Sequence, residues 1–329
     1  MRNILRDYKI FDIDPTRSRS KDFYKNMLDY RDHTMKQYHP AIKRAGFKCL
    51  LCGKSRAKEF LEYENYKLFD CLSCGLVSPN IDLEKLKSLE IYDDPAYIKD
   101  ATREILDTYN YRKGQYAPER LNYILQKTKL SPNKIKLLDL GCGPGYFLSY
   151  LKNKKIKYKG LELANFLVKI CKQKNLNVEG SDLRKEVSQS YNVITMFDVL
   201  EHLTDPVGLF KDLNNKIVKG GYVLAYTPNI HSLAYSLMKE RQNTLYPFQH
   251  LAFFDNKSLN YLAKKTGFKV FSIDYFGLDV ADYLYMKAYD DAHDYLEKLK
   301  DFIPTMQAVI DKQNLSNHMR IIFKKIKNV

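Results

Sequence analysis

Residues 137–148 read LLDLGCGPGYFL, an apolar run that leads directly into a glycine-rich turn. Such a run predicts a buried strand, and glycines directly after it let the backbone approach a ligand where the next helix offers its N-terminal N–H groups. A dinucleotide fingerprint would place its third glycine at position 146, where the sequence has Tyr146. Asp139 instead opens the pattern D-x-G-x-G-x-G. The three glycines are Gly141, Gly143 and Gly145.

Four further segments follow in an order that suits a nucleoside-binding α/β sheet. Glu162 ends the strand-like YKGLE, 21 residues beyond Gly141, where a carboxylate can accept both ribose hydroxyls of an adenosine. Asp182 follows in VEGSDL, and Phe197 precedes Asp198 in YNVITMFDVLEHLTDP. The last of these four segments is KGGYVLAYTPN.

Together these segments, over roughly residues 105 to 280, resemble class I S-adenosylmethionine-dependent methyltransferases. The resemblance implies S-adenosylmethionine as cofactor, with the adenine amino group held near Asp182. It also implies that residues 81–130 cap the cofactor, so that Tyr111, Arg112 or Gln115 either reaches the methionine carboxylate or is ordinary helix surface and core. The implied cofactor-binding residues are Asp139, Gly141, Gly143, Gly145, Glu162, Asp182, Phe197 and Asp198.

The predicted fold class is α/β: a doubly wound, seven-stranded, Rossmann-like sheet with a small N-terminal zinc ribbon and helical additions. We predict strands near 136–140, 158–162, 176–179, 192–196, 221–226 and 268–275, with a last strand over 318–326. In the family this last strand inserts antiparallel beside the sixth. The predicted domains are a basic arm or short helices over 1–46, the ribbon over 47–80, a helical cap over 81–130, and the methyltransferase domain over 131–329 with a helical insertion at about 281–314.

Four of the six cysteines form two C-x2-C pairs with 18 residues between them, and a glycine follows each pair. This spacing is typical of a zinc ribbon, in which four thiolates hold one structural Zn²⁺. Two disulfides or four free thiols are the alternatives, and a reducing compartment disfavours disulfides. We expect Cys142 and Cys171 to be small buried residues without a catalytic role. The expected metal ligands are Cys49, Cys52, Cys71 and Cys74.

Methyl transfer from a sulfonium requires an acceptor held in line with the methyl group and, where needed, a base that takes its proton. Ligands bind outside the carboxyl ends of parallel strands. Histidine suits the role of base because its pKa lies near neutral pH. His202 follows the fourth strand, and His250 lies in LYPFQHLAFFD, which in such families folds over the same opening. These two are the candidate catalytic residues, and His231 is a weaker one.

The formal net charge is +15 and the isoelectric point about 9.3, which invites a nucleic-acid partner. Lysines are nevertheless scattered among acidic residues, so we favour this partner less. The sequence has no apolar run of 18 residues, and its first residues lack a secretory signal pattern. We therefore expect a cytoplasmic protein without a membrane span, and a homo-oligomer is compatible with the sequence.

The chain has an N-terminal ribbon followed by a methyltransferase domain, and in this order it resembles bacterial enzymes that methylate sugars, nucleotide-linked sugars or polyols for surface polysaccharides. Family members that methylate carbon carry a further C-terminal domain, so O- or N-methylation is expected here. One alternative is an RNA base methyltransferase that grips RNA with the ribbon and basic surface, although FDVLEHL differs from the Asn-Pro-Pro-Tyr-like segment of many such enzymes. Another is a cofactor-binding scaffold without catalysis.

Overall fold

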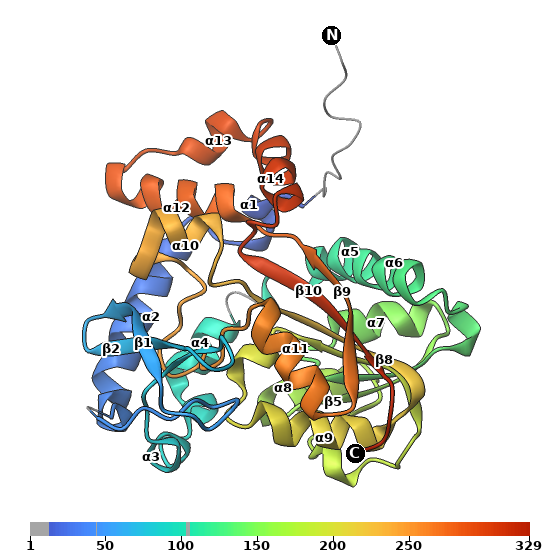
Figure 1. Ribbon diagram of the computed structural model, residues 1–329. Helices are drawn as coiled ribbons and strands as arrows, with labels where there is room; N and C mark the ends of the chain where they lie inside the picture. Colours follow the sequence, from blue (N-terminus) through green and yellow to red (C-terminus); the bar gives the residue numbers. More distant parts are fainter. Residues whose placement is uncertain (1–12, 44, 103–105) are drawn as a thin grey trace. The chain divides into compact units, whose positions relative to one another are not determined.

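The computed structural model describes residues 13–43, 45–102 and 106–329 (Figure 1). These residues form two compact units. The first unit contains the described residues up to Asp100 together with Pro228–Asp255 and Asp274–Arg320. The second contains Ala101–Thr227, Asn256–Ile273 and Ile321–Val329. The units therefore cut across the contiguous domains that the sequence predicts, and each is described by itself below.

The second unit is built on a seven-stranded sheet of order β6-β5-β4-β7-β8-β10-β9. The pairs β4–β5, β5–β6, β4–β7 and β7–β8 are parallel. β10 lies between β8 and β9, so the last strand inserts beside the sixth as expected. The strands are β4 (Lys136–Leu140), β5 (Lys157–Leu161), β6 (Val178–Glu179), β7 (Tyr191–Phe197), β8 (Ile217–Pro228), β9 (Phe268–Tyr275) and β10 (His318–Lys325).

Helices of the second unit pack in two groups, with α5 and α6 against α7, and α9 against α11 (Figure 1). Gly267, at a φ of 75°, follows α11, and Asp205 caps α9 by accepting from the N–H of Gly208 at 2.8 Å. Short 3-10 turns lie before β4 at 132–134, between β6 and β7 at 183–185, and after β7 at 200–202. The helices are α5 (Tyr109–Gly114), α6 (Tyr116–Thr128), α7 (Tyr146–Asn153), α8 (Asn165–Gln173), α9 (Pro206–Lys216) and α11 (Asn256–Lys265).

The first unit contains a small antiparallel sheet, β1 (Ala57–Tyr63), β2 (Tyr66–Cys71) and β3 (Val77–Pro79), which we call the ribbon sheet. Its core gathers aromatic side chains from distant parts of the chain, including Tyr38, Tyr66, Phe248 and Phe253. The helices are α1 (Pro15–Ser18), α2 (Phe23–Tyr38), α3 (Leu83–Lys87), α4 (Pro95–Ala101), α10 (Leu233–Met238), α12 (Asp279–Asp291), α13 (Tyr295–Leu299) and α14 (Ile303–Lys312). Among the described residues, no helix is both long and apolar enough to cross a membrane.

Every strand of the large sheet lies within a few residues of its predicted range, which confirms the predicted α/β fold. The N-terminal region differs from the expected arm or short helices, because α2 runs for 16 residues. One face of α2 is buried, but that face includes the polar Arg31 and Thr34 among its apolar residues. These polar residues hide the helical period from a reading of hydrophobicity alone.

Candidate functional site

The glycine loop after β4 has the backbone shape that a close ligand requires. Gly141, Gly143 and Gly145 all have positive φ angles, of 67°, 56° and 78°. A Cβ on Gly141 would lie 2.6 Å from Val199, and one on Gly145 would lie 2.5 Å from Leu176, so both glycines are also needed for packing. A Cβ on Gly143 would meet no atom of the described residues within 4 Å. Among those residues, the loop thus leaves open space at its central glycine.

Glu162 is tied to this loop by hydrogen bonds from the backbone. One carboxylate oxygen accepts from the N–H of Gly143 at 2.8 Å, and the other accepts from the N–H of Ala164 at 2.9 Å. Each carboxylate oxygen has two lone pairs, so each can accept a further hydrogen bond from a hydroxyl group. The carboxylate is therefore oriented before any ligand arrives.

Asp139 lies inside β4 and is buried, with 2% of its surface exposed. The hydroxyl of Thr195 donates to its carboxylate at 2.7 Å. Burial raises the pKa of Asp139 to about 7, although the Thr195 hydrogen bond and the charge of Arg120 oppose this rise. The Asp139 carboxyl group therefore links β4 to Thr195 on β7.

Asp182 is engaged at the start of the 3-10 turn Leu183–Lys185, which it caps by accepting from the N–H of Arg184 at 2.8 Å. The Arg184 guanidinium also donates to it at 2.6 and 3.0 Å. These hydrogen bonds lower the pKa of Asp182 to about 2, so the group is a carboxylate at neutral pH. Its predicted contact with adenine stays a prediction.

Phe197 and Asp198, at the end of β7, contact a buried arginine, Arg120, which is not among the site residues predicted from the sequence. The Arg120 guanidinium lies 4.0 Å from the centroid of the Phe197 ring and 3.7 Å from the Asp198 carboxylate. It also donates to the hydroxyl of Tyr146, while its buried Nε has no hydrogen-bond partner among the described residues. Asp198 adopts a φ of 57°, a conformation uncommon outside glycine. This buried cation can bind an anionic group of a ligand.

The sequence contains one signal that could have identified Arg120, which is its position within an apolar helix face. Ala117, Leu121 and Ile124 form the buried face of α6, and Arg120 lies on that same face with 5% of its surface exposed. A charged residue on an apolar helix face is costly to bury unless it has a partner or a function. An arginine on the apolar face of α6 is therefore an exception to the hydrophobic pattern that can be recognised from the sequence.

His202 ends the 3-10 turn Leu200–His202 after β7, and its neighbour Glu201 is buried. Thr227, at the end of β8, donates to the Glu201 carboxyl group at 2.9 Å. Burial, together with the charge of Asp198, raises the pKa of Glu201 well above its usual value. A carboxyl oxygen of Glu201 lies within 4.8 Å of a ring nitrogen of His202. From the sequence, Glu201 is expected to face the acceptor together with His202, and neither this position nor the role of His202 as base is tested by the structure.

His250 belongs to the first unit, in a turn after α10. Its Nδ1 lies 2.7 Å from the carbonyl oxygen of Thr244, which can only accept a hydrogen bond. In the neutral ring Nδ1 therefore carries the proton and Nε2 is the basic nitrogen. The rings of Tyr246 and Phe253 flank the imidazole, with centroids 5.2 and 6.3 Å away. The weaker candidate His231 is exposed and contacts the edge of Phe60.

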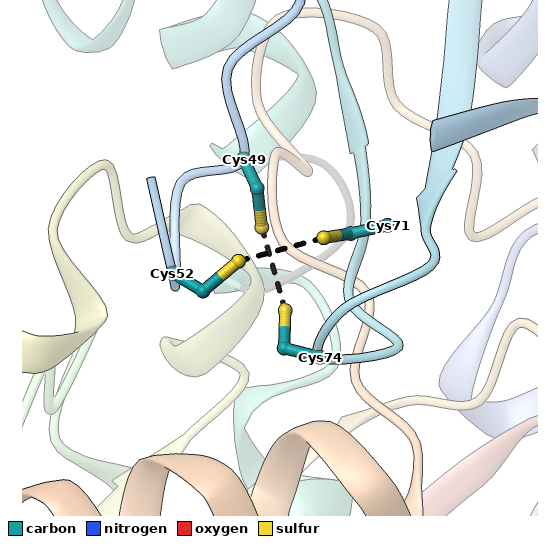
Figure 2. A group of neighbouring side chains, drawn as sticks. All are labelled: Cys49, Cys52, Cys71 and Cys74. Atoms are coloured by element: carbon teal, nitrogen blue, oxygen red, sulfur yellow. Dashed lines mark hydrogen bonds between the residues drawn. The ribbon is translucent and has the colours of Figure 1, made fainter. Parts of the chain in front are cut away.

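The four predicted ligand cysteines come together at the ribbon sheet, and none of them forms a disulfide (Figure 2). The Cys49 and Cys74 sulfurs are 3.5 Å apart, as are those of Cys52 and Cys71. Zn–S bonds of about 2.3 Å in a tetrahedron place sulfurs about 3.8 Å apart, so a small expansion fits zinc. A hydrogen bond from Cys74 lowers the pKa of the Cys49 thiol to about 5. The donor set and spacing thus suit a structural zinc ion.

The structure brings together the glycine loop with Glu162, the Arg120 guanidinium with Phe197 and Asp198, and His202 with Glu201, all in the second unit. The sulfurs form their own centre in the first unit, which also contains His250.

Known proteins resemble this chain over its central part. Residues 109–273, half of the chain, match the model of a family described as "Methyltransferase domain". Ubiquinone biosynthesis O-methyltransferase from Chromobacterium violaceum is 26% identical over 129 residues, which cover 36% of this chain and 55% of that protein. The enzyme of the same name from Coxiella burnetii is 29% identical over 126 residues, covering 36% and 53%. The chain spans about half the length of these curated relatives.

Solved structures with a similar fold include a SAM-dependent methyltransferase from Archaeoglobus fulgidus, with 24% identity, a TM-score of 0.44 and coverage of 63% of this chain and 94% of that one. Another is the plantazolicin methyltransferase BpumL in complex with SAH, with 17% identity, a TM-score of 0.46 and coverage of 74% and 98%. Both TM-scores lie below 0.5, so these two likenesses carry no conclusion about this chain. The family match, together with the sheet order and the glycine loop, identifies the chain as a member of the class I S-adenosylmethionine-dependent methyltransferases.

Proposed function

We propose that the protein methylates a hydroxyl group of a small molecule, with a histidine as general base. The observation that supports this most is the orientation of His250, whose Nδ1 is bonded to the Thr244 carbonyl at 2.7 Å, so that Nε2 is the basic nitrogen. A base matters for a sugar hydroxyl because its pKa is far above neutral, whereas a phenol needs less help. His202, beside the buried Glu201, is the second candidate for the same task.

We assign ribose binding to Glu162. The cofactor would approach the loop at Gly143. When bound, S-adenosylmethionine supplies an electrophilic methyl group on a sulfonium. The loop and Glu162 orient its adenosine, and the buried Arg120 offers a positive charge for its carboxylate. The base accepts the hydroxyl proton as the acceptor oxygen attacks. Asp139, Asp182, Phe197 and Asp198 complete the proposed cofactor-binding set.

For the acceptor, we propose a sugar, a nucleotide-linked sugar or another polyol of surface polysaccharide synthesis. The order of ribbon and methyltransferase supports this class. The names of the curated relatives favour a different hydroxyl, that of a ubiquinone precursor, and these relatives align over part of their length. Both classes share one chemistry, O-methylation of a small molecule.

We further propose one structural Zn²⁺, held by Cys49, Cys52, Cys71 and Cys74, with no step of the reaction assigned to it. Four protein ligands close the coordination shell, so no position is left for a substrate. Reduced thiols suit the cytoplasm, which we propose as the location.

The test is transfer of a labelled methyl group to a panel of a nucleotide-linked hexose, a catechol and a transfer RNA mixture. We expect labelling of a small-molecule hydroxyl, and His250→Ala or His202→Ala should lower turnover about 100-fold while cofactor affinity stays within twofold. His39→Ala, at an exposed histidine, is the matched control and should retain wild-type turnover. Wild-type turnover in both test variants contradicts the base assignment, and labelling of RNA alone contradicts the acceptor class.

A further inference from the structure

The turn that carries His250 is attached to the ribbon sheet at two points, both within the first unit. One lies two residues before His250, at Phe248, and the other three residues after it, at Phe253. Within the turn, the N–H of His250 donates to the carbonyl of Tyr246 at 2.9 Å, in addition to the Nδ1 contact with Thr244. The imidazole therefore keeps its position only while the turn keeps its shape.

Phe248 is the strained residue of this turn. Its φ is 67°, a left-handed conformation that is rare for a bulky side chain. Its N–H donates to the hydroxyl of Tyr66, on β2, at 3.2 Å. Its ring packs against Tyr66 and Tyr38 with centroids 4.9 and 6.0 Å apart, and all three side chains are 1% exposed. Tyr66 thus stabilises a backbone conformation that the turn does not favour by itself.

Phe253 supplies the second attachment. Its N–H donates to the Val77 carbonyl at 2.9 Å, and it accepts from the Val77 N–H at 3.0 Å, which is an antiparallel bridge to β3. Both residues are fully buried. Val77 lies three residues after Cys74, and Cys71 ends β2, so the cysteine centre joins the two strands that hold the turn.

We propose that Tyr66 is a positioning residue for His250, and that the ribbon sheet serves to hold the His250 turn in its working conformation. This inference rests on the proposed role of His250 as a base. Tyr66 acts through the Phe248 backbone and the Phe248 ring, and touches neither substrate nor cofactor. The glycine loop and Glu162 belong to the other unit, so the loss of Tyr66 should affect turnover and leave cofactor binding intact.

The decisive variant is Tyr66→Phe, which keeps the ring and removes only the hydroxyl that accepts from Phe248. The matched control is Tyr63→Phe, on the same hairpin, whose hydroxyl contacts Asp32 at 3.5 Å. Amide hydrogen exchange over residues 242–255 should become at least tenfold faster in Tyr66→Phe and stay unchanged in Tyr63→Phe. Turnover should fall about tenfold in Tyr66→Phe, with the cofactor Kd within twofold of wild type.

A double variant separates positioning from general stability. In a His250→Ala background, Tyr66→Phe should cause no further loss of turnover, because the group that it positions is gone. An equal loss in both backgrounds, or unchanged exchange over 242–255, overturns the proposal. Wild-type turnover in His250→Ala alone would instead contradict the base role, and the exchange result would still decide whether Tyr66 holds the turn.

Discussion

At the scale of single residues, the sequence identified candidate cofactor-binding side chains but not the contacts that hold them. Glycines and acids at strand ends are visible because they interrupt apolar runs. The two backbone hydrogen bonds to Glu162 are not visible in the sequence, because they depend on how the glycine loop and Ala164 fold around the Glu162 carboxylate. Arg120 escaped notice because its environment of aromatic rings comes from β7, β8 and α7.

Glu162→Ala should weaken binding of S-adenosylhomocysteine by about tenfold or more, measured by calorimetry. The variant removes the charged acceptor that we propose for the ribose hydroxyls, each such bond contributing about 1.5–3 kcal/mol, and it also frees the Gly143 N–H. Glu179→Ala is the control, because that exposed carboxylate on β6 pairs with Lys159 at 2.9 Å. Equal affinities for wild type and Glu162→Ala would mean that the adenosine lies elsewhere.

Asp139 should make the stability of the folded protein depend on pH. Its pKa is raised by burial to about 7, whereas in the unfolded chain it is about 3.9. The folded state keeps a proton that the unfolded state releases, so the free energy of unfolding falls as pH rises between about 4 and 7. Three pKa units correspond to about 4 kcal/mol.

Asp139→Asn cannot titrate, so this loss should disappear in the variant. Urea unfolding at several pH values, without cofactor, gives the free energy of unfolding of both proteins. The difference between wild type and variant should change by up to about 4 kcal/mol from pH 4 to pH 7. Parallel stability curves for wild type and variant would show that the pKa of Asp139 is the same in the folded and unfolded protein.

At the scale of elements, strands were easier to predict than the N-terminal helix. β4 and β9 have the predicted bounds because each is an apolar or alternating run closed by a clear turn signal. α2 was not recognised as one long helix, because Arg31 is buried on its inner face and satisfied by the distant carbonyls of Glu240 and Gln242. Such long-range partners have no signature in the local sequence.

The ribbon sheet should contain one zinc ion per chain when the protein is purified under reducing conditions. Elemental analysis should show Cys71→Ser with less than about a tenth of an equivalent, because three remaining ligands bind zinc far more weakly than four thiolates. Cys171→Ser changes a cysteine of α8 that lies outside the cluster, so it should retain a full equivalent. Reduced, folded wild-type protein without bound metal would contradict the prediction.

At the scale of the whole molecule, the predicted contiguous domains and the compact units divide the chain differently. Sequence motifs from 131 onward follow the family order, which gives no reason to separate 228–255 and 274–320 from the sheet. Their side chains nevertheless join the first unit, where Phe248 and Phe253 share a core with Tyr38 and Tyr66. Chain order could not predict this, because it depends on contacts between residues about 180 positions apart.

The net charge of +15 is the whole-molecule property that makes RNA an alternative acceptor. The salt dependence of the reaction distinguishes RNA from a small acceptor. Binding to RNA releases counterions, so six to ten phosphate contacts would lower affinity by about 10³–10⁵-fold between 50 and 200 mM salt. A sugar-sized acceptor releases few ions, and we expect its kcat/KM to change by less than about threefold over the same range. Turnover at saturating cofactor across this salt series measures the difference. A slope as steep as that of RNA binding would make the basic surface the acceptor site and RNA the better substrate class.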